Sequence, residues 1–226
     1  MINKKIFVAC DTSSLNNIKK IINQIKTNKL KLIPKFGLQF FYSKDGRKFL
    51  QNFKKDFWLD LKINDIPQTA LSAIDSIKDL KNCKYITVHA NGGLEMLKAV
   101  KKKAKETNKN LKVLGVTILT SLNNKSLKEI GHTKKVEQLV LEQADLIKKA
   151  NLHGIVCAAG LEAKAVRKRH KNLFIVTPGI RLPGDKADDQ SRVFTPYDAL
   201  INNNVSAVVM GRSIVKGNIK NNIKRL

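Results

Sequence analysis

The chain alternates strand-like and helix-like segments along its whole length, and no other feature limits its possible folds as strongly. Eight short runs rich in Val and Ile are each followed by a segment with helical periodicity. Such runs are typical of parallel strands that are buried on both faces. The expected strands are residues 4–11, 30–37, 57–62, 84–89, 111–121, 154–160, 173–180 and 205–213.

Eight β-then-α units in 226 residues predict an α/β fold, a single-domain (β/α)8 TIM barrel that spans residues 1–226. A doubly wound open sheet is the alternative. No GxGxxG motif follows the first strand, which argues against a dinucleotide-binding sheet. Ser13 or Ser14 is expected to cap a first helix that runs to about Asn28, and residues 195–203 are expected to form a short helix.

The composition predicts a soluble cytoplasmic protein without a membrane partner. Hydrophobic residues make up 42% of the chain, and no apolar run is long enough to span a membrane. The N-terminal sequence MINKKIFVACD enters a strand pattern directly, without an apolar signal region. Cys10, Cys83 and Cys157 are far apart and form no CxxC pair, which indicates a reducing compartment and no structural zinc.

The formal net charge of +25 is compatible with a nucleic-acid partner. However, the lysines are spread over nearly every expected helix, and the densest basic group, residues 167–171, is not interleaved with aromatic residues. The sequence also lacks a zinc-finger or RNP-type motif. We therefore interpret the charge as solvated helix faces and expect no nucleic-acid partner.

The third expected strand ends in charged residues. In the sequence FWLDLKINDIPQT, residues 57–69, Asp60 and Lys62 share one face of the strand and lie about 6–7 Å apart along it. Asp65 follows in the loop before a helix that opens at Pro67. Buried charges are costly unless they are paired, so these three favour a functional site. A surface ion pair on an edge strand is the structural alternative.

Other polar residues fall at the carboxyl ends of expected strands or just after them. In a barrel these positions converge on one mouth, where active sites lie. They are Asp11, Lys35, Asp60, Lys62, His89, Thr120 and Arg181. Gln190, Gly211 and Arg212 follow the seventh and eighth strands, the usual position of a barrel phosphate site. Taken singly, each residue also has a structural interpretation, such as a helix-capping Asp or a core His.

The sequence LDLKINDIPQT resembles the signature of the orotidine 5′-phosphate decarboxylase family. Further motifs of that family occur in the family's order across nearly the whole chain: VACD, KFG, VHANGG, VTILTS, VTPGIR, DQSRVFTP and VVMGRSI. The combination is specific, although DxKxxD alone is shared with related sugar-phosphate decarboxylases. Gln39 departs from the family pattern KxGxExF, which has an acid there, and the loop sequence GIRLPGDKADDQ is local to this chain.

The resemblance implies a carboxy-lyase that removes the C6 carboxylate of orotidine 5′-monophosphate, giving UMP and CO2 in the last step of de novo pyrimidine nucleotide synthesis. It implies neither a metal nor an organic cofactor, and a homodimer with active sites at the subunit interface. By position, Lys62, Asp60 and Asp65 are the expected catalytic residues. The expected substrate-binding residues are Asp11, Lys35, Ile66, Thr69, Thr120, Ser121, Pro178, Arg181, Gln190, Gly211 and Arg212.

Loss of CO2 from this substrate leaves a carbanion at C6, which the site must stabilise electrostatically. Lys62 can do so and can then protonate C6 as a general acid, with Asp60 and Asp65 flanking it. By the resemblance, Asp65, Ile66 and Thr69 reach the partner subunit's site. The remote phosphate can close a loop over the site, and residues 182–189 are the expected lid.

The sequence leaves two other functions open. The first is a metal-dependent barrel enzyme acting on a phosphosugar, of the 3-keto-gulonate-phosphate decarboxylase or hexulose-phosphate synthase type. Thr120, Arg181 and Gln190 argue against it, because they fit a pyrimidine and a phosphate. The second is a non-enzymatic basic binding protein, which predicts steeply salt-dependent affinity for nucleic acid and no need for the strand-end acids.

Overall fold

Eight parallel strands close into a barrel in the order of the sequence. The structure is a computed structural model that describes residues 5–27, 30–185 and 193–226. The strands are β1 (Lys5–Ala9), β2 (Lys31–Gly37), β3 (Phe57–Ile63), β4 (Cys83–His89), β5 (Lys112–Val116), β6 (Gly154–Val156), β7 (Phe174–Thr177) and β8 (Ala207–Met210). The expected TIM barrel is confirmed, and the open sheet is wrong because β8 pairs with both β7 and β1, which closes the ring of strands.

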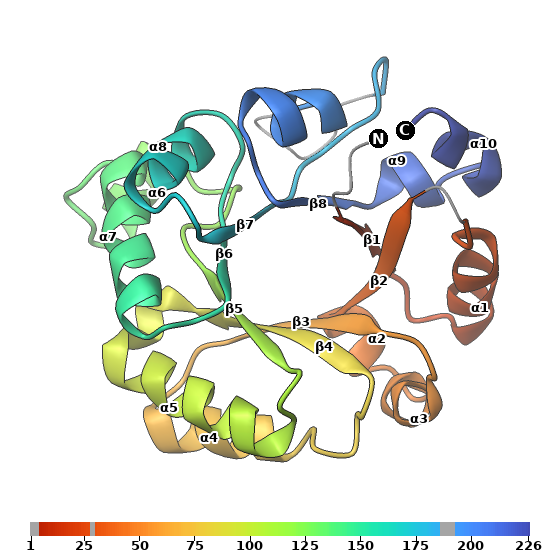
Figure 1. Ribbon diagram of the computed structural model, residues 1–226, viewed down its shortest axis with the longest axis horizontal. Helices are drawn as coiled ribbons and strands as arrows, with labels where there is room; N and C mark the ends of the chain where they lie inside the picture. Colours follow the sequence, from red (N-terminus) through yellow and green to blue (C-terminus); the bar gives the residue numbers. More distant parts are fainter. Residues whose placement is uncertain (1–4, 28–29, 186–192) are drawn as a thin grey trace.

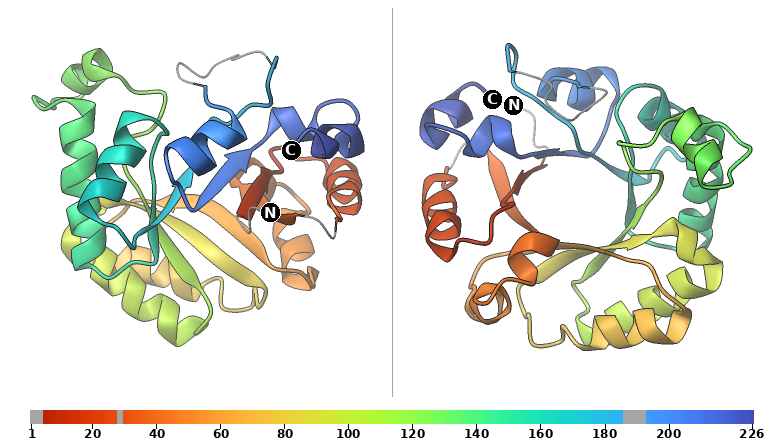
Figure 2. Two further views of the ribbon diagram at one scale, coloured as in Figure 1. Left: turned by 45° about the horizontal axis from the view of Figure 1, so that its top comes forward. Right: turned by 180° about the vertical axis from the view of Figure 1, so that it is seen from behind.

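Helices cover the outside of the barrel in all three ribbon views (Figure 1 and Figure 2). They are α1 (Leu15–Gln24), α2 (Leu38–Phe41), α3 (Gly46–Asn52), α4 (Pro67–Asp75), η1 (Ala90–Gly92), α5 (Gly93–Thr107), α6 (Asn124–Glu129), α7 (Val136–Lys149), α8 (Leu161–Arg169), η2 (Asp198–Asn202), α9 (Arg212–Val215) and α10 (Ile219–Lys224). In the described ranges, no helix combines the length and apolar character needed to cross a membrane.

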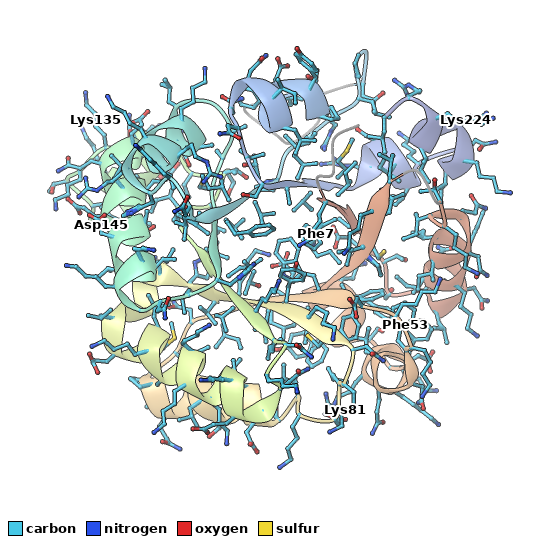
Figure 3. The ribbon with its side chains drawn as sticks, viewed as in Figure 1. Phe7, Phe53, Lys81, Lys135, Asp145 and Lys224 are labelled. Atoms are coloured by element: carbon cyan, nitrogen blue, oxygen red, sulfur yellow. The ribbon has the colours of Figure 1, made fainter. Side chains whose placement is uncertain are left out.

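Side chains from alternate strand positions fill the interior of the barrel. The Phe7 ring meets Trp58 and Tyr85 edge to face, with centroid distances of 4.7 Å and 5.1 Å. Figure 3 shows Phe7 inside the ring of strands and Phe53 outside it, where a second core lies between the strands and the helices. The polar residues at the strand ends therefore stand above an apolar floor.

The later strands end earlier than the sequence pattern indicates. β5 stops at Val116, because the chain then turns, and the Leu122 N–H donates to the Leu119 carbonyl at 2.9 Å. β6, β7 and β8 are also shorter than expected, so more of each motif belongs to the loops of the mouth. The turns α2 and α6 were not expected, since elements this short carry little periodicity.

The first and the last expected helices also differ in part from the structure. Ser14 caps α1, as expected for one of the two serines, and its side chain accepts a hydrogen bond from the Asn17 N–H at 3.3 Å. The helix ends at Gln24, earlier than Asn28. Residues 195–203 contain a short π-helical turn, η2, in place of a regular helix.

The labelled lysines lie on the outside of the molecule. Figure 3 shows Lys81, Lys135 and Lys224 at the periphery, and all three are exposed. Their positions on different sides of the barrel agree with solvated outer faces as the origin of the positive charge.

We predict that Phe7→Ala destabilises the fold by about 3–5 kcal/mol, because this fully buried ring would leave a cavity beneath the mouth. Urea denaturation followed by circular dichroism measures the change. Leu161→Ala, at a side chain that is 71% exposed, is the control. It is expected to change the free energy of unfolding by less than about 0.5 kcal/mol. Equal losses in the two variants would contradict a packed barrel interior.

Candidate active site

A cavity of ≈ 510 Å³ opens at the carboxyl ends of the strands. Residues at or after the ends of β1, β2, β3, β5, β6, β7 and β8 line it. Its apolar lining includes Trp58, Val116, Val156 and Val209, which belong to the packed barrel interior. The cavity is therefore the upper continuation of the barrel core, and parallel strands bring polar residues from distant parts of the chain to its rim.

Most of the expected site residues line this cavity together. They are Asp11, Lys35, Asp60, Lys62, Thr120, Pro178, Arg181, Gly211 and Arg212. They come from six different strand ends, and no local stretch of sequence holds them together. The convergence expected at the barrel mouth is thus present in the structure.

The segment that follows β3, residues 65–69, does not line the cavity. Asp65, Ile66 and Thr69 are exposed and do not line it. Asp65 Oδ1 accepts a hydrogen bond from the Ile66 N–H at 2.7 Å. Within one subunit these three residues are not brought to the charged cluster, although the sequence places them next to it.

Three further expectations concern the loops. Ser121 is exposed and lies outside the cavity, whereas its neighbour Thr120 lines it. Gln190 lies outside the described residues, and so does the part of the expected lid from 186 to 189. The first part of that lid is described, and Leu182 is buried against the core.

A chain of alternating charges crosses one side of the cavity. Asp60 Oδ2 lies 2.9 Å from the Lys35 Nζ and 2.9 Å from the Lys62 Nζ. Lys35 Nζ also lies 3.6 Å from Asp11 Oδ1. The side chains of Lys35 and Asp60 are nearly buried, at 8% and 9% exposed, while Lys62 is 34% exposed. Lys62 is therefore the most exposed of the three residues, although all three line the cavity.

Mutual pairing keeps the buried charges ionised. Burial would raise the pKa of the Asp60 carboxyl, but Lys35 and Lys62 outweigh this effect and lower that pKa to about 2. Burial would lower the pKa of Lys35, but Asp60 and Asp11 outweigh it and raise that pKa above its usual value. Asp60 and Lys35 are thus both charged at neutral pH, in surroundings where little water screens them.

The backbone of β3 is irregular where these charges lie. Its pairing with β4 shifts register between Leu59 and Ile63, and Lys62 has a φ of 51°. A left-handed conformation costs a non-glycine residue roughly 1–2 kcal/mol. Such strain concentrates at functional sites. The irregularity therefore places the strained backbone of β3 at Lys62, beside the buried Asp60 carboxylate.

Arginine side chains provide a second polar region of the cavity. Arg181 is only 6% exposed, and its Nε and Nη2 atoms are buried without a hydrogen-bond partner in the described residues. Arg181 and Arg212 line both the main cavity and an adjoining one of ≈ 270 Å³. Two neighbouring guanidinium groups, with the unpaired donors of Arg181 among the described residues, form an arrangement suited to a phosphate or carboxylate.

Two inward-facing residues of β4 complete the surroundings of the cluster. The Thr87 hydroxyl donates to Asp60 Oδ1 at 2.8 Å, a contact that was not predicted from the sequence. Alternation along β4 could have indicated it, since Thr87 lies between Tyr85 and His89 on one face. His89 is partly buried, and both its burial and Lys62 lower its pKa. Its Nδ1 is buried without a hydrogen-bond partner among the described residues, so the interpretation of His89 as a hydrogen-bonded core histidine is not supported at this atom.

The donor set in the described residues does not form a metal site. No group of three or more His, Cys, Asp or Glu side chains among them is arranged to hold a metal ion. The acids near the cavity are instead paired with lysines.

Comparison with known proteins places this geometry in a family. The orotidine 5′-phosphate decarboxylase / HUMPS family profile matches residues 4–224. The orotidine 5′-phosphate decarboxylase of Wolbachia sp. subsp. Brugia malayi (strain TRS) is 39% identical over 216 residues, covering 94% of this chain and 92% of the relative. That of Malacoplasma penetrans (strain HF-2) is 34% identical over 222 residues, covering 96% and 94%.

The fold also matches a solved structure that carries the same enzyme name as these relatives. The crystal structure of orotidine 5′-phosphate decarboxylase from Lactobacillus acidophilus has a TM-score of 0.82 and 28% sequence identity, and the match covers 98% of this chain and 96% of that one. Because sequence and structure both match over nearly the whole barrel, the chain belongs to the orotidine 5′-phosphate decarboxylase / HUMPS family and is an enzyme of the carboxy-lyase class.

Proposed function

We propose that this enzyme converts orotidine 5′-monophosphate to UMP and CO2, the last step of de novo pyrimidine nucleotide synthesis. The observation that carries the proposal is the Lys35–Asp60–Lys62 cluster, which lines the same cavity as Arg181 and Arg212 and has Lys62 as its most exposed member. The names of the two relatives support the same reaction.

The substrate is proposed to lie across the cavity between its two charged regions. The phosphate binds on the side of Pro178, Arg181, Gly211 and Arg212, and Gln190 is proposed to bind it as well. The ribose hydroxyls contact Asp11 and Lys35, and Thr120 or Ser121 hydrogen-bonds the pyrimidine. The unused donors of Arg181 support the phosphate position, because a buried guanidinium needs an anionic partner.

The Lys62 ammonium group is the proposed general acid. When the bond between C6 and the carboxylate breaks, the electron pair stays on C6 and CO2 leaves. The ammonium group stabilises this charge and then transfers one proton to C6, which gives UMP and a neutral lysine that regains its proton from water. Asp60 orients Lys62 through the 2.9 Å ion pair, so little rearrangement is needed during the reaction.

The proposed active unit is a homodimer. Asp65, Ile66 and Thr69 are exposed beside the cluster and contribute nothing to the cavity of their own subunit. Their outward position supports a role at the partner subunit's site, where Asp65 would extend the row of alternating charges. Ile66, at 66% exposed, offers an apolar contact for the same interface.

We further infer that the enzyme works in the cytoplasm and needs neither a metal nor an organic cofactor. Its three cysteines are buried and unpaired, which suits a reducing compartment. The reaction as written uses only the charges of the chain and a proton, so it requires no redox group.

We predict that Lys62→Ala lowers kcat by about 10⁴-fold or more, because the charge stabilisation and the proton donor are lost together. Loss of ultraviolet absorbance of orotidine 5′-monophosphate, measured with chelator-treated protein, reports turnover. Calorimetry is expected to show that UMP still binds. Lys98→Ala, which removes an equal charge from the exposed surface of α5, is the control and should leave kcat unchanged.

Near-normal turnover by the Lys62→Ala variant would rule out Lys62 as the acid. Absence of turnover by the folded wild-type protein would contradict the proposed reaction. If a divalent metal then enabled conversion of a sugar phosphate, a metal-dependent enzyme of the same family would be favoured.

A second prediction tests the shared site. Asp65→Ala and Lys62→Ala are each expected to be nearly inactive, but mixing and re-equilibrating the two variants should restore up to about 25% of wild-type activity, because half of the dimers carry one intact site. Single-turnover titration with substrate measures the number of active sites. Failure of exchanged heterodimers to regain activity would show that Asp65 serves its own subunit.

A further inference from the structure

The β3–β4 ladder is interrupted beside the charged cluster. Leu59 pairs with Ile86, and the next paired residues are Ile63 and Val88. Residues 60–62 of β3 therefore lie opposite Thr87 alone. Extra residues in one strand leave backbone groups without their ladder partners, and these groups need other partners when they are buried.

The Thr87 hydroxyl supplies one of the missing partners. The Lys62 N–H donates to Thr87 Oγ1 at 3.0 Å, in place of a carbonyl of β4. This bond lies at the residue with a φ of 51°, so it holds the strained turn of the backbone from which the Lys62 side chain departs.

The same hydroxyl also contacts the carboxylate that pairs with Lys62. Its proton is donated to Asp60 Oδ1 at 2.8 Å, while Asp60 Oδ2 faces the ammonium groups of Lys35 and Lys62. Thr87 therefore fixes both ends of the Asp60–Lys62 ion pair, one through the backbone and one through the side chain. Because Thr87 is 0% exposed, water cannot replace its hydroxyl without a cavity forming.

We propose that Thr87 is a positioning residue for the decarboxylation, which aligns the Lys62 ammonium group by holding the β3 bulge and the Asp60 carboxylate together. The proposal rests on the proposed function, since it assigns Lys62 as the acid that Thr87 aligns. It adds a residue outside the cavity lining, and it explains why a buried hydroxyl stands on β4 between Tyr85 and His89.

If Thr87 had a purely structural role, its removal would resemble the removal of any other buried hydroxyl. Thr117, just after β5, is also almost fully buried, and its hydroxyl donates to the Val156 carbonyl at 3.0 Å. This bond joins neighbouring strands without contacting a charged group. Thr117→Val therefore removes a buried hydroxyl of the same kind and serves as the matched control for Thr87→Val.

The experiment compares Thr87→Val, Thr87→Ser and Thr117→Val with the wild-type protein in the decarboxylation assay. Thr87→Val keeps the volume but removes both hydrogen bonds, so kcat is expected to fall by about 10- to 100-fold while KM changes by less than about threefold. Thr87→Ser keeps the hydroxyl and should stay within about threefold of wild type. Thr117→Val should lower the melting temperature without a comparable loss of kcat.

The pH dependence provides an independent readout. The Thr87 hydroxyl donates to the ionised form of Asp60 and therefore favours it. Its removal should raise the pKa of Asp60, which Lys35 and Lys62 otherwise help to hold at about 2. Carboxyl ¹³C NMR of the unliganded protein measures this shift without any need for turnover. Asp60 should titrate at higher pH in Thr87→Val than in wild type, Thr87→Ser or Thr117→Val.

The outcomes separate this proposal from the proposed function. Wild-type kcat and KM in Thr87→Val, or equal losses of kcat in Thr87→Val and Thr87→Ser, would overturn the positioning role. No turnover by the wild-type protein would overturn the proposed function, and an unchanged Asp60 titration would then still reject the Thr87–Asp60 coupling. If Thr87→Val fails to fold, Thr87→Ala compared with Thr87→Ser makes the same test of the hydroxyl.

Discussion

The buried ion pairs of Asp60 with Lys35 and Lys62 are the interactions on which the rest of the site depends. Removing a charge from water costs several kcal/mol, and only well-placed partners offset that cost. Both lysine ammonium groups lie 2.9 Å from the same carboxylate oxygen, and the other oxygen accepts the Thr87 hydroxyl. Asp60 therefore has fixed partners on both oxygens, which leaves Lys62 as the partly exposed end of the network.

The closed barrel makes this burial possible. Parallel strands bring Lys35 from β2 and Asp60 from β3 to the same edge, although they are 25 residues apart in sequence. Below them, Phe7 and Trp58 fill the interior, so little water reaches the cluster from that side. The low-polarity floor strengthens each ion pair, and it would equally strengthen the interaction of Lys62 with a charge that develops in the cavity.

The sequence predicted most of the barrel and much of the site for a physical reason. Strand ends are read from apolar runs, and a barrel directs all of them to one mouth, so Asp11, Asp60 and Arg181 could be grouped without a structure. Thr87 was missed because a threonine in a strand usually serves packing, and its partner depends on a register shift in β3. The outward position of Ile66 was equally hidden, since exposure depends on how the chain leaves the strand.

The left-handed backbone at Lys62 is informative because only two other non-glycine residues of the described backbone have a positive φ. The other non-glycine residues with positive φ in the described ranges are Asn151 and Asn204, and asparagine tolerates that conformation better than other side chains. Lysine has no such tolerance, so its conformation persists only because the surrounding contacts require it. β3 thus combines an interrupted ladder, a left-handed residue and a buried carboxylate. At this strand the backbone departs from its local conformational preferences and so sets the position of the Lys62 ammonium group.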